Sequence, residues 1–132
     1  MTPLAEVLGS IAHIMFPADD TPREIFLSSR AEDGDTPLHV FAWRKDLEAA
    51  RLLIAAGADP NAVGDMGETP LHVAVRQDLP ELARALLAAG ASADIVSELE
   101  ESPREMTVRK GGELASVFSG FGTVLGRTRR FR

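Results

Sequence analysis

The tetrapeptide Thr36-Pro37-Leu38-His39 recurs unchanged as Thr69-Pro70-Leu71-His72, 33 residues further along the chain. A third, degenerate copy begins at Ser102-Pro103, after the same interval. Other residues match at this offset: Gly34 with Gly67, Leu53 with Leu86, and Gly57-Ala58 with Gly90-Ala91. So much agreement at one offset indicates an internal repeat, in which each copy forms one supersecondary unit.

Each copy predicts two helices joined by turns. Thr36 and Thr69 are suitable N-caps, because their hydroxyls can accept hydrogen bonds from the open amides of a first helical turn. The prolines that follow suit the first helical position, where a missing amide N–H costs nothing. We expect first helices over residues 37–44 and 70–77, and second helices over 47–56 and 80–89. Gly57 and Gly90 would end the second helices as left-handed C-caps.

This pattern resembles the ankyrin repeat. The resemblance is carried by the Thr-Pro-Leu-His boxes, the leucine pairs of the second helices (Leu52-Leu53, Leu86-Leu87), the Gly57-Ala58-Asp59 segment and Asn61. It implies an all-α solenoid of helix-turn-helix repeats with short β-hairpin loops. It also implies that His39 and His72 bridge backbone groups between neighbouring repeats.

On this alignment the chain divides into five segments. Residues 1–31 hold an N-terminal capping helix and the first hairpin strand, and residues 32–64 and 65–97 are ankyrin repeats. Residues 98–122 are a degenerate C-terminal capping repeat, and residues 123–132 are a basic, flexible tail. The apolar spacing from Leu4 to Phe16 predicts one amphipathic capping helix.

Some positions depart from the family pattern. Lys45 and Asp78 stand where ankyrin repeats have a glycine after the first helix, and the third copy has Gly111 there. A positive φ at Lys45 or Asp78 would cost stability. In the third copy, Glu100 replaces the turn glycine and Arg104 replaces a core leucine. Such polar drift is typical of a terminal repeat whose outer face meets water.

The composition excludes several classes of function. The 132 residues contain no cysteine, which excludes disulfides and cysteine-based metal sites. No run approaches the ~20 apolar residues that a membrane-spanning helix needs, and no secretory signature is present. We therefore expect a cytoplasmic protein. Residues 1–126 carry 20 acidic and 10 basic residues, a net charge of −10 that would repel a nucleic-acid backbone.

The resemblance to ankyrin proteins places a partner-binding surface on the concave groove, which the hairpin tips and the exposed sides of the first helices line. The expected residues at the hairpins are Glu32, Asp33, Asp35, Asp65, Met66, Glu68, Glu98, Leu99 and Glu101, and those on the helices are Trp43, Arg44, Arg76, Gln77, Arg109 and Lys110. This predicts an acidic ridge beside a basic row that contains Trp43, a residue type enriched in binding hot spots. Two alternatives are that the charges only keep the solenoid soluble, and that Trp43 packs over Phe41 or the N-terminal cap.

No constellation for catalysis or for a cofactor is recognisable. The two repeat histidines have no third ligand at metal spacing, and no nucleophile or phosphate-loop motif occurs. We therefore expect a monomeric protein-binding module without cofactors. The chain resembles compact bacterial ankyrin proteins, some of which neutralise secreted toxins, so an immunity protein or inhibitor is the sharpest hypothesis. The alternatives are a scaffold or adaptor that self-associates through its C-terminal cap, and an enzyme whose site forms only on oligomerisation.

Overall fold

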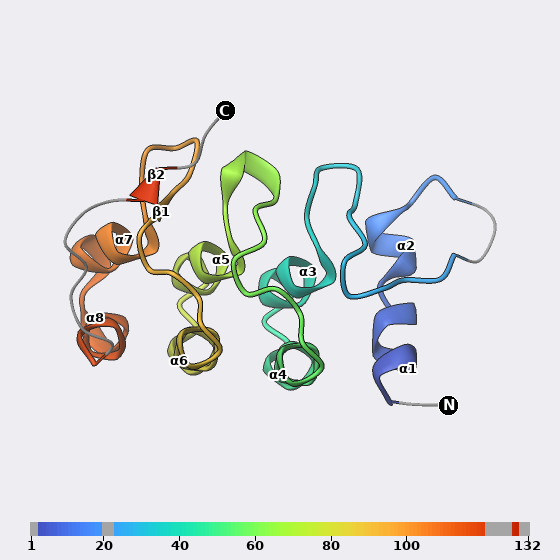
Figure 1. The fold of residues 1–132 in the computed structure, drawn as a ribbon, viewed down its shortest axis with the longest axis horizontal. Helices are drawn as coiled ribbons and strands as arrows, with labels where there is room; N and C mark the ends of the chain where they lie inside the picture. Colours follow the sequence, from blue (N-terminus) through green and yellow to red (C-terminus); the bar gives the residue numbers. More distant parts are fainter. Residues whose placement is uncertain (1–2, 20–22, 121–127, 130–132) are drawn as a thin grey trace.

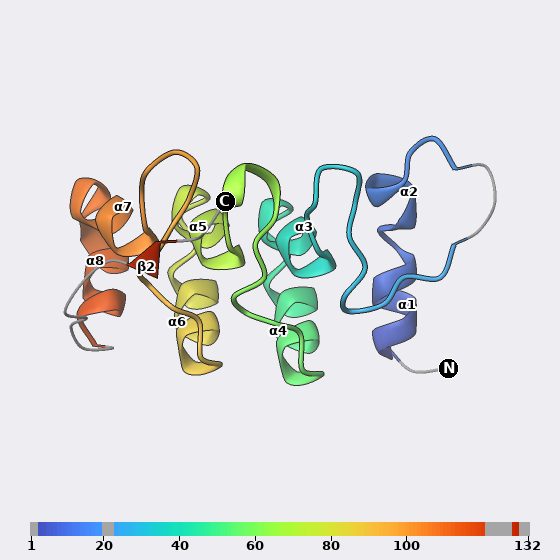
Figure 2. The ribbon, with the colours of Figure 1, turned by 45° about the horizontal axis from the view of Figure 1, so that its top comes forward.

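The computed structural model describes residues 3–19, 23–120 and 128–129, and these form a row of stacked helix pairs (Figure 1). The first helices of the three pairs form one layer, and the second helices form a layer beneath it (Figures 1 and 2). The pairs are α3 (Pro37–Trp43) with α4 (Leu47–Ala55), α5 (Pro70–Arg76) with α6 (Pro80–Ala88), and α7 (Pro103–Lys110) with α8 (Gly112–Ser119). Within the layers, α5 packs between α3 and α7, and α6 between α4 and α8.

The predicted capping chemistry starts the first helices. Thr36, Thr69 and Ser102 are N-caps with extended backbone, and a proline follows each of them at the first helical position. Small residues then let the layers approach closely, since Ala42, Ala50, Ala74 and Ala83 have no exposed surface. The N-cap and proline of each repeat therefore determine where its first helix begins, and the alanines determine which face of the helix is buried.

The core repeats with the sequence. Leu53 and Leu86, which match at the 33-residue offset, are both fully buried. In the third copy, Leu114 and Phe118 are 1% and 2% exposed, and they take the places of Leu82 and Leu86 after the loss of one residue. Burial of each such side chain contributes about 1.5–3 kcal/mol.

The prediction of one continuous N-terminal helix is wrong. The segment forms α1 (Pro3–Gly9) and α2 (Ala12–Met15), with a break at Ser10 and Ile11. Glycine at the end of α1 is a poor helix former, and the Ser10 hydroxyl donates to the carbonyl of Val7 at 2.6 Å, a local bond that weakens a helix at this position. The two short helices still cover the N-terminal end of the stack, where α1 packs on α4.

The connections between pairs are loops over residues 56–69 and 89–102, and each first helix follows a turn at the tip of its loop. Each turn is closed by a backbone hydrogen bond across five residues: Ala31 to Asp35 at 2.8 Å, Gly64 to Glu68 at 2.8 Å, and Ser97 to Glu101 at 2.9 Å. Among the described residues no two strands flank one turn, so these hairpin loops lack a regular strand ladder. The second turn contains the 3₁₀ helix η1 (Asp65–Gly67).

The basic C-terminal segment is not wholly a free tail. Thr128–Arg129 form strand β2, which pairs in parallel with β1 (Ile95–Val96) at the base of the third turn. The prediction of a flexible tail is therefore wrong for these two residues, and its other residues lie outside the described part. In the described chain, no helix is long or apolar enough to cross a membrane.

The backbone at the predicted glycine positions is left-handed, as expected. Lys45 and Asp78 both have a φ of 59°, and Gly111 at the matching position has a φ of 65°. Glu100, which replaces the turn glycine, also has a φ of 65°. Met66 also has a φ of 58°, at a position where the family pattern did not predict a glycine. These non-glycine residues retain strain that the stacked pairs hold in place.

We predict that Lys45→Gly raises the free energy of unfolding by up to about 1 kcal/mol, because glycine adopts this φ without strain. A comparison variant is Gly111→Ala, which should lower it by about 1–3 kcal/mol, because Gly111 has a φ of 65° and a ψ of −155°, a region open essentially to glycine alone. A Cβ at Gly111 would meet no atom within 4 Å, so its effect is conformational only. Urea denaturation of both variants measures the difference, and a loss of stability in Lys45→Gly would contradict this account.

Candidate functional site

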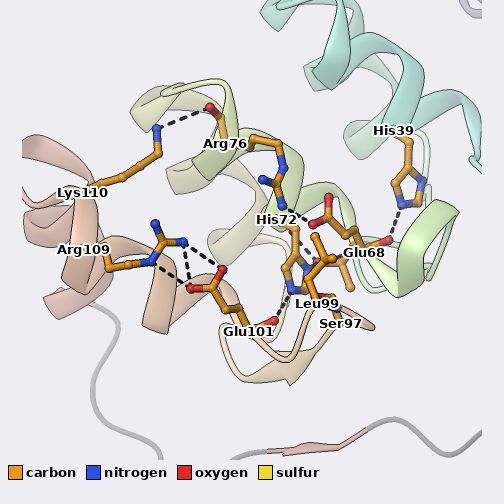
Figure 3. A network of polar contacts seen from close by, with 10 residues as sticks. His39, Glu68, His72, Arg76, Ser97, Leu99, Glu101, Arg109 and Lys110 are labelled. Atoms are coloured by element: carbon orange, nitrogen blue, oxygen red, sulfur yellow. Dashed lines mark hydrogen bonds and ion pairs between the residues drawn. The ribbon is translucent and has the colours of Figure 1, made fainter.

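Two histidines tie each turn to the first helix of the preceding pair (Figure 3). The ring of His39 is fully buried, and its Nε2–H donates to the backbone carbonyl of Glu68 at 2.9 Å. His72 makes the same bond to the carbonyl of Glu101 at 2.9 Å. The predicted bridging role of both histidines is thus confirmed. Because the bonds run from one pair to the next, they set the position of each turn above the helices.

The same rings also close the N-terminal caps of their own helices. The amide of Thr36 donates to Nδ1 of His39 at 3.1 Å, and the amide of Thr69 donates to Nδ1 of His72 at 3.0 Å. Nδ1 must therefore keep its lone pair while Nε2 carries the proton, which is the neutral tautomer. Burial lowers the pKa of both histidines below their ordinary value of 6.5. The charged groups near them (Asp35, Asp33 and Arg30 at His39, and Glu68 and Arg76 at His72) partly offset one another.

We predict that the protein loses stability as the pH falls below 6.5. Below that pH the unfolded chain binds more protons than the folded one, so the free energy of unfolding falls by at most about 1.4 kcal/mol per pH unit for each histidine. His72→Gln should be less stable at pH 7 but flatter in its pH dependence between pH 7 and 5. His13→Gln, on the exposed side of α2, controls for the loss of one imidazole from the chain.

The protonation of Asp35 changes the stability in the opposite direction: as the pH falls, it makes the folded protein more stable. Burial raises its pKa above 3.8, so its contribution to stability is greatest below that pH and is lost as the pH rises through the raised value. Because both wild type and His72→Gln contain Asp35, its effect cancels when their slopes of unfolding free energy against pH are compared. Equal slopes in the two proteins would contradict the role of His72.

The carboxylate of Asp35 is internal rather than displayed to a partner. Its residue is 6% exposed, and Oδ1 accepts the amide N–H of Asp65 at 2.8 Å. This bond holds the first turn against the second, and Gly64 leaves the room for it. The expectation that Asp35 lies on an exposed hairpin is therefore wrong, because its Oδ1 accepts a hydrogen bond from the adjacent turn.

We predict that Gly64→Ala lowers the free energy of unfolding by about 1–3 kcal/mol, as overpacking does. A Cβ at residue 64 would overlap Oδ1 of Asp35 and lie 3.0 Å from Nε2 of His39. Gly9→Ala is the control, because a Cβ there meets nothing within 4 Å. Thermal unfolding followed by circular dichroism compares them, and equal midpoints would show that the turns can shift freely.

Acidic and basic residues expected to form separate rows instead pair with each other (Figure 3). Glu68, which is 5% exposed, forms an ion pair with Arg76, and both oxygens of Glu101 accept from Arg109 at 2.8 and 2.9 Å. The prediction of an exposed Glu68 is wrong for this reason. Two acids of the predicted ridge are thus neutralised by two bases of the predicted row within the chain.

Two further members of the predicted surface join the ends of neighbouring first helices. The side-chain amide of Gln77 donates to the carbonyl of Trp43 at 3.0 Å, and Nζ of Lys110 donates to the carbonyl of Arg76 at 3.4 Å. Each spans 34 residues, and each satisfies a carbonyl left open at a helix C-terminus. Gln77 and Lys110 therefore have structural contacts at this face.

The remaining members of the predicted surface fall into two groups. Glu32, Asp33, Arg44 and Glu98 are exposed and do not line the hollow of this face. Trp43, Met66 and Leu99 surround a hollow of about 210 Å³ between the turns and the first helices. They are 41%, 45% and 48% exposed, and each comes from a different repeat. The other lining residues are Asp35, Asp65, Glu68, Val73 and Arg76.

Trp43 therefore contributes to an open surface. Phe41, over which it could have packed, is 2% exposed and belongs to the core. Among the described residues, no group of three or more His, Cys, Asp or Glu side chains is placed to hold a metal ion.

Comparison with known protein families agrees with this geometry. Residues 11–97 match the family described as ankyrin repeats (3 copies). The chain belongs to the ankyrin-repeat family, whose members are protein–protein interaction modules and are generally non-catalytic. No curated protein matches it.

The internal pairing could have been found in the sequence. An acidic residue is followed eight positions later by arginine in two successive repeats, as Glu68 with Arg76 and Glu101 with Arg109. This spacing becomes visible only when the charges of successive repeats are compared with one another. The hollow itself has no local signal, since its apolar residues lie 23 and 33 positions apart.

Proposed function

We propose that this protein binds a partner protein through the hollow lined by Trp43, Met66 and Leu99. The observation that supports this proposal is that three exposed apolar side chains from three successive repeats converge on one concave spot. Exposed apolar side chains scattered singly need no explanation, whereas a cluster on a hollow is typical of an interaction site. Aromatic and methionine side chains are the types enriched at such sites.

The surroundings of the hollow are suited to a rigid docking surface. The histidine bridges, the Asp35–Asp65 bond and the two acid–arginine pairs hold the turns in place before any partner arrives. A surface that is already ordered loses little conformational entropy on binding. Glu32, Asp33 and Asp65 add exposed negative charge at the turn tips, which favours a partner with a basic patch and speeds association.

The toxin-immunity role remains a prediction from the family resemblance, as do the scaffold and self-association roles. All of them would use a pre-ordered surface of this kind. They differ in the partner: an inhibitor binds one toxin with high affinity, and self-association makes the apparent mass depend on concentration.

We predict that Trp43→Ala weakens partner binding at least about 30-fold, which corresponds to about 2 kcal/mol. The partner is to be identified by affinity capture from the native host, and its affinity for purified variants measured by calorimetry. The matched control is Phe26→Ala, because Phe26 is 57% exposed at the N-terminal end and does not line the hollow.

Unchanged affinity of Trp43→Ala, together with a loss in Phe26→Ala, would move the interface to the N-terminal end. Co-expression of the chain with the captured protein then tests the finer hypothesis. Rescue of growth from a toxic partner supports inhibition, whereas a non-toxic partner rules it out.

A further inference from the structure

The first repeat breaks the acid–arginine pattern of the other two. Glu68 is paired with Arg76 and Glu101 with Arg109, at a spacing of eight residues. The residues at these two positions in the first repeat are Asp35 and Trp43, by the same 33-residue offset. Trp43 thus stands where the second and third repeats place a guanidinium.

The substitution leaves Asp35 without the cation that its counterparts have. Within the described residues, no lysine or arginine forms an ion pair with Asp35. The contact made by its carboxylate is the bond from Oδ1 to the amide of Asp65. The chain therefore keeps an acidic group at this position while omitting its partner.

The hollow lies where the missing cation would be. It is lined by Asp35, Trp43 and Asp65, and Arg76, which also lines it, is already paired with Glu68. The lining thus holds three carboxylates and one guanidinium, so it has a net negative charge. Val73, Met66 and Leu99 supply apolar walls.

Resting on the proposed function, we propose that this hollow receives an arginine side chain of the partner protein. Its guanidinium pairs with the exposed carboxylate of Asp65 and its charge stabilises the buried carboxylate of Asp35 in the wall of the hollow, while its plane and aliphatic stem lie against Trp43 and Met66. The partner completes the first repeat in trans with the group that the second and third repeats supply from their own chain.

The physical chemistry of the lining favours this occupant. Tryptophan has the aromatic face that attracts cations best, and guanidinium stacks on it more readily than ammonium does. Burial raises the pKa of the Asp35 carboxyl, because its charged form is poorly solvated. A cation that displaces the remaining water stabilises that charge, and a charge-assisted hydrogen bond is stronger than a neutral one.

The experiment uses the full chain and a small probe, so it does not depend on knowing the partner. Isotope-labelled protein is titrated at low salt with N-acetyl-arginine amide and with its neutral isostere, N-acetyl-citrulline amide. The indole N–H resonance of Trp43, the one tryptophan of the chain, reports on the hollow. We expect saturable shifts with a Kd of about 1–10 mM for the arginine probe, and binding at least about fivefold weaker for citrulline.

Variants locate the probe. Trp43→Arg, followed through the amides of Asp65 and Met66, should abolish binding, because the chain then supplies its own guanidinium. It should fold, since arginine already occupies positions 76 and 109. Asp65→Asn should weaken binding at least about threefold, whereas Glu32→Gln, at an exposed acid outside the hollow, should change it less than about 1.5-fold.

Equal affinity for the two probes, or equal losses in Asp65→Asn and Glu32→Gln, would overturn the proposal. So would a gain of more than about threefold on Arg130→Gln with Arg132→Gln, which would assign the hollow to the chain's own tail. If the probe fails while partner capture still depends on Trp43, only the arginine assignment falls and the proposed function stands. If the probe binds as expected and capture does not depend on Trp43, the proposed function falls, and the arginine assignment falls with it.

Discussion

The hydrogen bond from a buried histidine to the next turn is the interaction on which the structure depends. Each ring accepts from the backbone at its own helix start and donates to the carbonyl of Glu68 or Glu101 in the following turn. A single neutral side chain thus links local capping to the stacking of repeats. Because both nitrogens are occupied, burial of the ring leaves no unsatisfied polar atom, which is the condition for placing a histidine in a core.

This constraint also decides where function can lie. The histidine bonds hold the second and third turns against the first helices. The face between the turns and the first helices is therefore ordered. Several of its charges are used to hold it together: Glu68 pairs with Arg76, Glu101 pairs with Arg109, and Asp35 bonds to the next turn. The first repeat differs, since a tryptophan replaces the arginine and leaves an apolar, negatively charged hollow. A binding surface can therefore arise from one substitution in a repeated network.

Local signals in the sequence predicted the secondary structure well where the chemistry is local. Threonine followed by proline marked the helix starts, and the observed φ of 59° at Lys45 and Asp78 followed from their alignment with Gly111. The predictions of the N-terminal helix and of the loop strands were less accurate, because these elements depend on contacts beyond their own segment. The N-terminal helix breaks after Gly9, and in the described residues the loops lack the paired strands of a regular hairpin.

The sequence by itself determined the repeat, its period and the capping residues, because these depend on contacts within a repeat or on a fixed offset of 33 residues; the bridging role of the histidines was implied by the resemblance to ankyrin repeats. Only the tertiary structure decided which of the predicted surface residues face solvent. Asp35 and Glu68 are hidden because stacking brings an amide and a guanidinium to their carboxylates. Trp43, Met66 and Leu99 meet for the same reason: side chains from three repeats become neighbours only when the repeats are stacked.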